Sequence, residues 1–430
     1  MADNRGLTEH GRIAALSIHA DYRCGRTGLC CRTPWDVPVE PAPFLTIETA
    51  RRDGRLPVVQ PFAGATPPPG YRAVLRRDGE GSCVCLDAPT RLCRVHGVLG
   101  EQALPTACRL FPRVARTDAL GTVVTLSHYC PTAARMLLRD DVPLAVVEAP
   151  PAFPPGDYEG LSADDLPPLL HPRMLMGYDD YAAWEAHAVS VCASAPTVWT
   201  ALATLTRDAE QMRTWRPGAA TLQARLDEIA GDGLVEVAGP PPVAWFEDRM
   251  REVLVAVPVH LQRSPLMERF RALGLPGGLA ARGASPAAFA ERCIPTGSVA
   301  LPSNTPGILG HRALPSGRLV RLGATRDLHH GLPGFTPEVP GASHAPALRY
   351  LAAHALGNWC AYQGRGLRTY VRSLEAAAAV LVTTAPGQVD LAGDEGFLAA
   401  VRDADLLLRH LASSEALAGT WSQYEGPAVR

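Results

Sequence analysis

The cysteines of this chain are concentrated in one stretch, and that concentration constrains the fold more than any other feature. The chain has 430 residues and eleven cysteines. It is long enough for two or three ordinary domains, so it needs no disulfides to compensate for a small core. We therefore interpret the stretch as a metal-binding or iron–sulfur module attached to a larger body. It contains Cys24, Cys30, Cys31, Cys83, Cys85, Cys93, Cys108 and Cys130.

The compartment that we expect for the chain favours metal ligands over disulfides. The N-terminal residues MADNRGLTEHGR are polar and lack the apolar core of a signal peptide. No uninterrupted apolar run reaches the length of about 18 residues that a membrane-spanning helix needs. We expect a cytoplasmic protein without membrane insertion. In that reducing compartment, clustered thiols are more commonly metal ligands or redox groups than structural disulfides.

The charge pattern excludes some classes of function. The formal net charge is −2 and there is no basic tail, so we expect no nucleic-acid partner. Every cationic side chain is arginine, because the sequence contains no lysine. No lysine of this chain can therefore serve as a base, as a Schiff-base nucleophile or as a site of self-modification.

The apolar periodicity predicts a mainly α fold. We expect a Cys-rich metal-binding module over residues 1–150, built of short β elements and loops, and a mostly helical domain over 151–430. Within the module, residues 71–77 alternate as a strand does, and a short helix is predicted near residues 44–56. Residues 274–344 are rich in glycine and proline and form an irregular insertion. Helical patterns cover residues 178–215 with a break near Pro196, 219–230, 243–273, 345–385 and 394–418.

Seven or eight cysteines are more than one zinc ion can bind. A tetrahedral zinc needs four ligands, and adjacent Cys30 and Cys31 cannot easily both bind one ion. Two sites or a polynuclear cluster fit better, although buried thiols without metal and regulatory disulfides remain as alternatives. Whether Cys85, His96 and His128 bind metal stays open. Arginines that flank the cysteines could lower their pKa values and offset thiolate charge: Arg23, Arg26, Arg32, Arg91, Arg94, Arg109 and Arg113.

Three segments resemble the cysteine-cluster proteins that are described as zinc- or iron-chelating, and within them the flagellin lysine-N-methylase branch. The segments are CGRTGLCC (24–31), GSCVCLDAPTRLCRVHGVLGEQALPTACRLFPR (81–113) and TLSHYCPTAARMLL (125–138). Cys85 departs from the family pattern, which has an apolar or aromatic residue there. The resemblance covers about residues 20 to 140. It implies that the metal ligands are Cys24, Cys30, Cys31, Cys83, Cys93, Cys108 and Cys130.

Two hypotheses of function follow. In the first, the chain is an enzyme with an iron–sulfur cluster, zinc or iron, and it transfers methyl groups from S-adenosylmethionine to lysines of flagellin or another surface protein, as the resemblance implies. In the second, it is a non-catalytic metal-binding or redox protein with a helical docking domain. No dinucleotide-type glycine loop and no C-x₃-C-x₂-C run supports a familiar S-adenosylmethionine fold. For the first hypothesis we expect an acidic cleft near Asp179, Asp180, Glu247 or Asp248.

The other cysteines and the tryptophans have simpler interpretations. We expect Cys192, Cys293 and Cys360 to be core or surface thiols. Five tryptophans at helical positions are expected to lie in the core rather than around a substrate. They are Trp184, Trp199, Trp215, Trp245 and Trp359.

Overall fold

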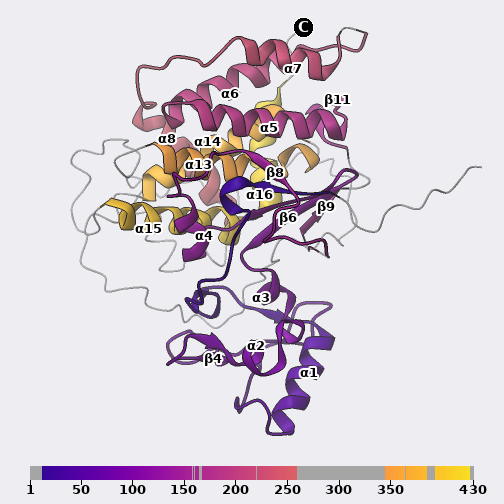
Figure 1. Ribbon diagram of the computed structural model, residues 1–430, viewed down its shortest axis with the longest axis vertical. Helices are drawn as coiled ribbons and strands as arrows, with labels where there is room; N and C mark the ends of the chain where they lie inside the picture. Colours follow the sequence, from indigo (N-terminus) through magenta and orange to yellow (C-terminus); the bar gives the residue numbers. More distant parts are fainter. Residues whose placement is uncertain are drawn as a thin grey trace, which may run out of the picture.

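The computed structural model describes residues 12–156, 158, 160–163, 167–218, 220–258, 344–363, 365–384 and 393–426. Helices dominate these residues and the sheets are small, which confirms the mainly α fold class. Figure 1 shows a helical body above a smaller lobe that contains helices α1 (Pro41–Arg52), α2 (Arg94–Leu99) and α3 (Thr106–Leu110). We call residues 29–110 the lower lobe. The insertion predicted at 274–344 and Cys293 lie outside the described residues, except for His344.

A five-stranded sheet lies where the body meets the lower lobe. Its strand order is β8-β1-β7-β6-β9. Strands β6 and β7 form an antiparallel hairpin, and β1 runs parallel to β7. The lower lobe is therefore an excursion of the chain between two strands of one sheet. The strands are β1 (Arg12–Leu16), β6 (Arg113–Asp118), β7 (Gly121–Leu126), β8 (Val146–Glu148) and β9 (Gly160–Ser162).

Gly121 allows β1 and β7 to approach each other. Its φ is +132°, and a Cβ atom there would lie 2.1 Å from the carbonyl oxygen of Arg12. Only glycine fits both the conformation and the contact.

The two faces of the sheet are covered differently. Val124 and Leu126 pack beside α4 (Pro131–Met136), whereas the Thr125 hydroxyl donates to the carbonyl of Ala353, 3.2 Å away in helix α13 (Ala345–Ala355).

The body is a stack of helices around α14 (Leu367–Thr384), most of which is buried. Helix α14 packs against α6, α8, α13, α15 and α16. The break predicted near Pro196 separates α5 from α6, so the pattern of residues 178–215 is confirmed as two helices. Trp184 and Trp199 are buried in this core, and the other three predicted core tryptophans pack against it half-buried. The remaining helices are α5 (Tyr178–Ser194), α6 (Val198–Arg213), α7 (Leu222–Gly231), α8 (Val243–Val255), α15 (Gly393–Asp405) and α16 (Ser414–Ser422).

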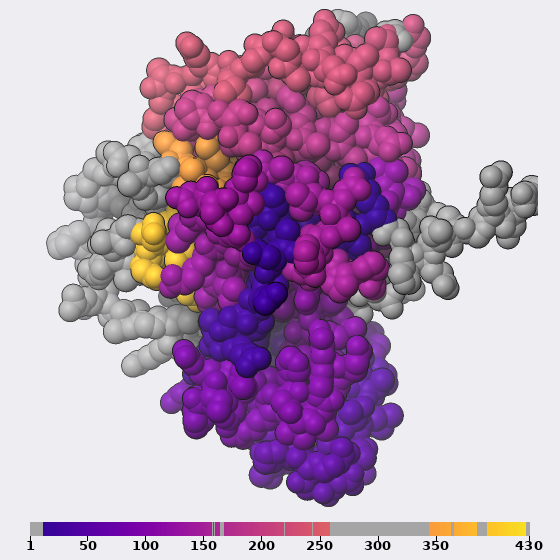
Figure 2. Space-filling model, viewed as in Figure 1, coloured from indigo at the N-terminus to yellow at the C-terminus, as the bar shows by residue number. Residues whose placement is uncertain are grey.

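The lower lobe has an apolar cluster of its own. Its buried side chains come from residues 31 to 104, and the cysteines are part of it. Its strands are very short: β2 (Pro38–Val39) pairs with β3 (Ala73–Val74), and β4 (Leu86–Asp87) pairs with β5 (Leu92–Cys93). The strand predicted over 71–77 is thus real but brief. Figure 2 shows this lobe projecting below the body. The division of the chain at residue 150 stays a prediction.

Aromatic side chains join the lower lobe to the body. The ring of Trp35 is stacked on His410 with centroids 4.2 Å apart, and Tyr129 and Phe111 pack around the same pair. His410 belongs to a π-helical turn, Leu406–Leu411, that continues α15. Such turns are uncommon and often mark functional or junction positions. In the described part of the chain, no helix is long and apolar enough to cross a membrane.

Candidate metal centre

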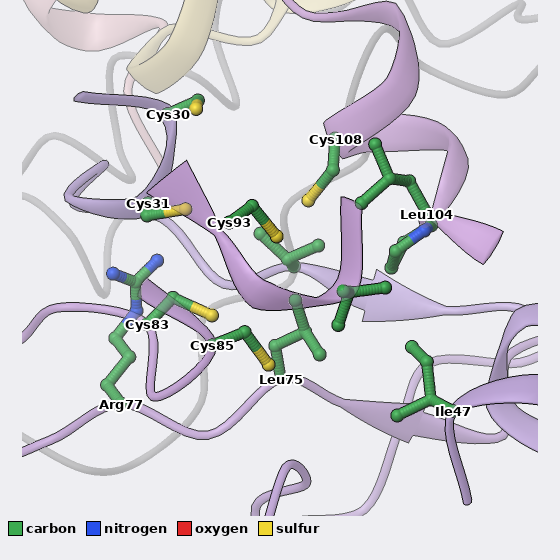
Figure 3. Close-up of a pocket in the computed structure, with 13 residues that line it drawn as sticks. Cys30, Cys31, Ile47, Leu75, Arg77, Cys83, Cys85, Cys93, Leu104 and Cys108 are labelled. Carbon is green, nitrogen blue, oxygen red and sulfur yellow. The ribbon is translucent and has the colours of Figure 1, made fainter. Parts of the chain in front are cut away.

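Six cysteines of the lower lobe line one small cavity. The cavity has a volume of about 20 Å³ and is otherwise lined by aliphatic side chains, Pro105 and Arg77. Figure 3 shows the sulfur atoms turned toward the same space, with Cys30 at its edge. Segments far apart in the sequence therefore deliver thiols to one place. The six are Cys30, Cys31, Cys83, Cys85, Cys93 and Cys108.

Local backbone features aim these thiols. Gly28, with φ +72°, starts the turn Leu29–Cys31, and a side chain at this position would meet the carbonyl of Arg91 at 3.0 Å. The carbonyl of Cys31 accepts a hydrogen bond from the Cys83 amide at 2.7 Å, which joins the first two cysteine segments. Residues 83–85 form a turn, and the Arg94 amide then donates to the Cys85 carbonyl at 2.8 Å. Backbone hydrogen bonds thus fix the loops that carry the sulfurs.

The thiols interact with one another. Hydrogen bonding to the Cys31 thiol lowers the pKa of three neighbours, Cys30, Cys83 and Cys93. One S–H group holds a single proton, so Cys31 can serve only one of these neighbours at a time. Burial opposes thiolate formation and raises the pKa of Cys108. A bound cation would stabilise several buried thiolates at once, because its positive charge would offset their negative charge.

Arg77 supplies a positive charge at the cavity. Its guanidinium donates to the carbonyl of Gly81 at 2.7 Å, to the carbonyl of Trp35 and to the Thr33 hydroxyl at 3.4 Å. These contacts hold the side chain in place among the cysteines (Figure 3). After hydrogen bonds from Cys31 and Cys85, the charge of Arg77 is a further cause of the lowered pKa of Cys83. The arginine therefore favours a thiolate at the cavity wall.

The donor set fits a thiolate-bound metal centre. Six thiols exceed the four ligands of one zinc ion, so the number of donors would suffice for a polynuclear centre. Within the described ranges, no three cysteine, histidine or carboxylate side chains already stand in the geometry of a metal site. The ten described cysteines are all free. The fit therefore rests on the chemistry of the donors and on their shared cavity.

The structure brings together five of the seven cysteines that the resemblance implies as ligands. The other two, Cys24 and Cys130, do not line the cavity. Cys85, whose role the sequence left open, does line it and is 1% exposed. His96 is exposed and contributes its backbone amide, which hydrogen-bonds to the Cys93 sulfur.

Cys192 and Cys360 are buried, as predicted for core thiols, and burial raises both pKa values to about 12.

His128 belongs to a different group, a buried polar cluster around Asp405. The backbone amide of His128 donates to Asp405, and its Nε2 lies 3.3 Å from Nε2 of His19. The Asp405 carboxylate also accepts from the Tyr350 hydroxyl at 3.0 Å and interacts with His354 Nε2 at 2.9 Å. Burial opposes the charge of Asp405, but Arg409 and hydrogen bonds from His128 and His354 hold the pKa of Asp405 well below the usual range.

This cluster predicts that acid destabilises the protein. Burial, and then the charge of Arg409, lower the pKa of His354 from 6.5 to about 4, and burial likewise lowers that of His19. Below pH 6.5 the unfolded chain therefore binds protons that the folded chain does not, so stability falls as pH falls toward 4. For His354 alone the loss at about pH 5 is about 2 kcal/mol. Denaturant midpoints at about pH 7 and about pH 5 measure it, and a higher midpoint at the lower pH would contradict the assignment.

Two of the four acidic residues that were expected to line a substrate cleft form contacts within their own helix or at its start. The Asp180 carboxylate accepts from the Gly177 amide at 3.3 Å at the start of α5, and Asp248 pairs with Arg251 at 2.5 Å within α8. Figure 1 places the start of α5 beside strand β11 (Met174–Leu175), whereas α8 lies on the other side of the body. A single cleft that contains all four residues stays a prediction.

Two features of the site and one of the Asp405 cluster were not predicted from the sequence. Arg77 was not singled out, although it lies six residues before Cys83. The aliphatic lining was not predicted, and neither was the pairing of His19 with His128, because contacts between distant segments leave no local pattern. Comparison with models of protein families, with curated proteins and with solved structures gave no match.

Proposed function

We propose that this chain binds a metal ion or an iron–sulfur cluster through the thiolates of the lower lobe. One observation carries the proposal: six cysteine sulfurs surround a single small cavity beside a fixed arginine. Thiolates are soft donors that select zinc, copper(I) or iron–sulfur clusters. The ligands would come from the turn Leu29–Cys31, from residues 83–93 and from Cys108 on α3. When bound, the centre would tie these three segments together.

Differential alkylation tests this proposal on the full-length protein. In the metal-loaded protein we expect the pocket thiols of Cys83 and Cys93 to resist iodoacetamide, because metal-bound thiolates are protected. After a chelator removes the metal under reducing conditions, these thiols should become labelled. Cys192 and Cys360 serve as internal controls, because burial in the helical body should keep them unlabelled in both samples. Equal labelling of the pocket thiols before and after chelation would contradict a metal centre.

We further propose, from the resemblance to the flagellin lysine-N-methylase branch, that the chain transfers methyl groups from S-adenosylmethionine to protein lysines. The acceptor must come from a partner such as flagellin or another surface protein, since the chain has no lysine. The metal centre would either hold the amino and carboxylate groups of the donor or act only as a structural element. Incubation with labelled S-adenosylmethionine and flagellin tests this step. Label that enters flagellin only with the metal-loaded protein would support it.

The alternative is a non-catalytic metal-binding or redox protein whose helical body docks onto partners. The observation behind this alternative is the cysteine cavity itself, whose lining of six thiols and aliphatic side chains would hold a metal without a further cofactor. A metal-loaded protein that has no affinity for S-adenosylmethionine and leaves flagellin unlabelled would support it over methyl transfer.

A further inference from the structure

Cys24 and Cys130 lie near each other, outside the cysteine cavity. The loop that carries Cys24 contacts the first turn of α4, directly after Cys130. The Gly25 amide donates to the Thr132 hydroxyl at 3.1 Å, and a Cβ atom on Gly25 would lie 2.5 Å from that oxygen. Two thiols that are distant in sequence are therefore held on neighbouring segments that touch.

The two thiols differ in exposure. Cys24 is exposed, whereas Cys130 is 6% exposed and its sulfur lies 3.7 Å from the Tyr22 hydroxyl. The Arg26 amide donates to the Cys24 sulfur at 3.4 Å, and exposed Arg23 and Arg26 flank it. Reactive cysteines characteristically lie in such exposed, electropositive surroundings. An accessible thiol beside a buried second thiol is the arrangement of an attacking and a resolving cysteine.

Burial is the main cause of the raised pKa of Cys130, and negative charge on Cys24 raises it further. Burial is also the main cause of the raised pKa of Tyr22, to which Cys130 and then Cys24 contribute.

We propose that Cys24 and Cys130 form a redox-active thiol pair that is separate from the metal centre and closes to a disulfide by exchange with a low-molecular-weight disulfide. The Cys24 thiolate attacks one sulfur of the small disulfide and releases one small thiol. The Cys130 thiolate then attacks the Cys24 sulfur of the mixed disulfide and releases the second. Two protein thiols are oxidised, one small disulfide is reduced to two thiols, and the two protein protons pass to the released thiolates.

A disulfide between Cys24 and Cys130 would fix the chain at the point where it passes from the body to the lower lobe. Cys24 lies between β1 and the turn Leu29–Cys31, and Cys130 lies at the start of α4. The disulfide would therefore anchor the segment that leads to Cys30 and Cys31. It differs from the ligand role that the resemblance implies for the same two cysteines, and the two roles can be told apart by experiment.

The test uses the metal-loaded, full-length protein. It is incubated with oxidised glutathione, its free thiols are blocked with iodoacetamide, and it is digested by arginine-specific cleavage for mass spectrometry. Cleavage after Arg23 and Arg26 releases Cys24 on its own short peptide. We expect this peptide to be linked to the Cys130 peptide and to be released by dithiothreitol. The link should be absent from Cys24→Ser and from Cys130→Ser and present in the control Cys192→Ser.

Metal content in the same samples separates this proposal from the metal centre. We expect Cys24→Ser and Cys130→Ser to keep the metal content of the wild type, whereas Cys83→Ser should lose it. Glutathione attached to Cys24 without a link to Cys130 would overturn the thiol pair. Loss of metal from Cys24→Ser and Cys130→Ser as complete as from Cys83→Ser would also overturn it. A linked pair in a wild type that contains no metal would support the pair and refute the metal centre.

Discussion

Replacement of Glu185 by alanine is expected to lower the free energy of unfolding by about 3–5 kcal/mol. Glu185 on α5 pairs with Arg116 on β6 through two hydrogen bonds of 2.8 and 3.0 Å, and both side chains are about 1% exposed. The carboxylate also accepts from the backbone amides of Gly357 and Asn358. Its removal leaves a buried guanidinium whose charge is offset only in part, by Asp118 at 3.5 Å, and loss of one partner of a buried ion pair is strongly destabilising.

Glu228→Ala is the matched control for this substitution. It removes the same carboxylate from an exposed ion pair with Arg225 on α7. Exposed pairs contribute about 0–1 kcal/mol, so the control should unfold close to the wild type. Denaturant midpoints of the three proteins provide the comparison. A Glu185→Ala protein that unfolds within about 1 kcal/mol of the control would show that the Arg116 pair does not join sheet and helix as described.

Replacement of Asp405 by alanine is expected to cost a similar amount, about 3–5 kcal/mol. The carboxylate is fully buried and is the common partner of the His128 amide, the Tyr350 hydroxyl and His354 Nε2. Its Oδ1 also lies 3.6 Å from Nε of Arg409. Without Asp405 the His128 amide, the Tyr350 hydroxyl and His354 Nε2 lose this partner, and the residue before the π-helical turn loses its hydrogen bond to the loop that follows β7. Far-UV circular dichroism during urea unfolding measures the loss.

Glu395→Ala on the same helix is the control for Asp405→Ala. Glu395 forms an ion pair of 2.7 Å with Arg135, but both side chains are more than half exposed. The control therefore removes a carboxylate from α15 at a cost of about 0–1 kcal/mol. If the two variants were equally stable, the Asp405 cluster would not be a major source of stability.

Local sequence signals predicted the helices of the body well. Pro196 separates α5 from α6 because proline cannot continue a helix, and the apolar spacing placed α7 correctly. The single helical pattern predicted over 345–385 is wrong in one respect, because the structure divides it into α13, which ends at Ala355, and α14, which begins at Leu367. The five-stranded sheet was not predicted. Its strands are three to six residues long and come from distant parts of the chain. Strands this short give little periodicity, and their pairing depends on tertiary contacts that a local pattern does not contain.

The site was likewise predicted only in part, because local patterns indicate some of its residues but not the contacts between distant segments. The concentration of cysteines predicted a module over residues 1–150, and six of the eight clustered cysteines lie in the lower lobe, residues 29–110. The spacing of Cys83 and Cys85 suggested that they share a face. The structure places both sulfurs at one cavity, although a turn rather than a strand orients them. Sequence could not separate Cys24 and Cys130 from the other cysteines, because their position depends on the contact between Gly25 and Thr132. The methyl-transfer and docking hypotheses remain predictions.

The measurement that tests the central proposal most directly is metal and acid-labile sulfide analysis of anaerobically purified protein, with an absorption spectrum. About four irons with sulfide and a broad visible band would establish an iron–sulfur centre. Zinc alone, at about one or two equivalents, would establish a structural metal site. In either case we expect Cys30→Ala/Cys31→Ala to lose the metal and Cys192→Ala to retain it. A wild-type protein that contains neither iron nor zinc would contradict the proposal that the six cysteines of the lower lobe bind metal.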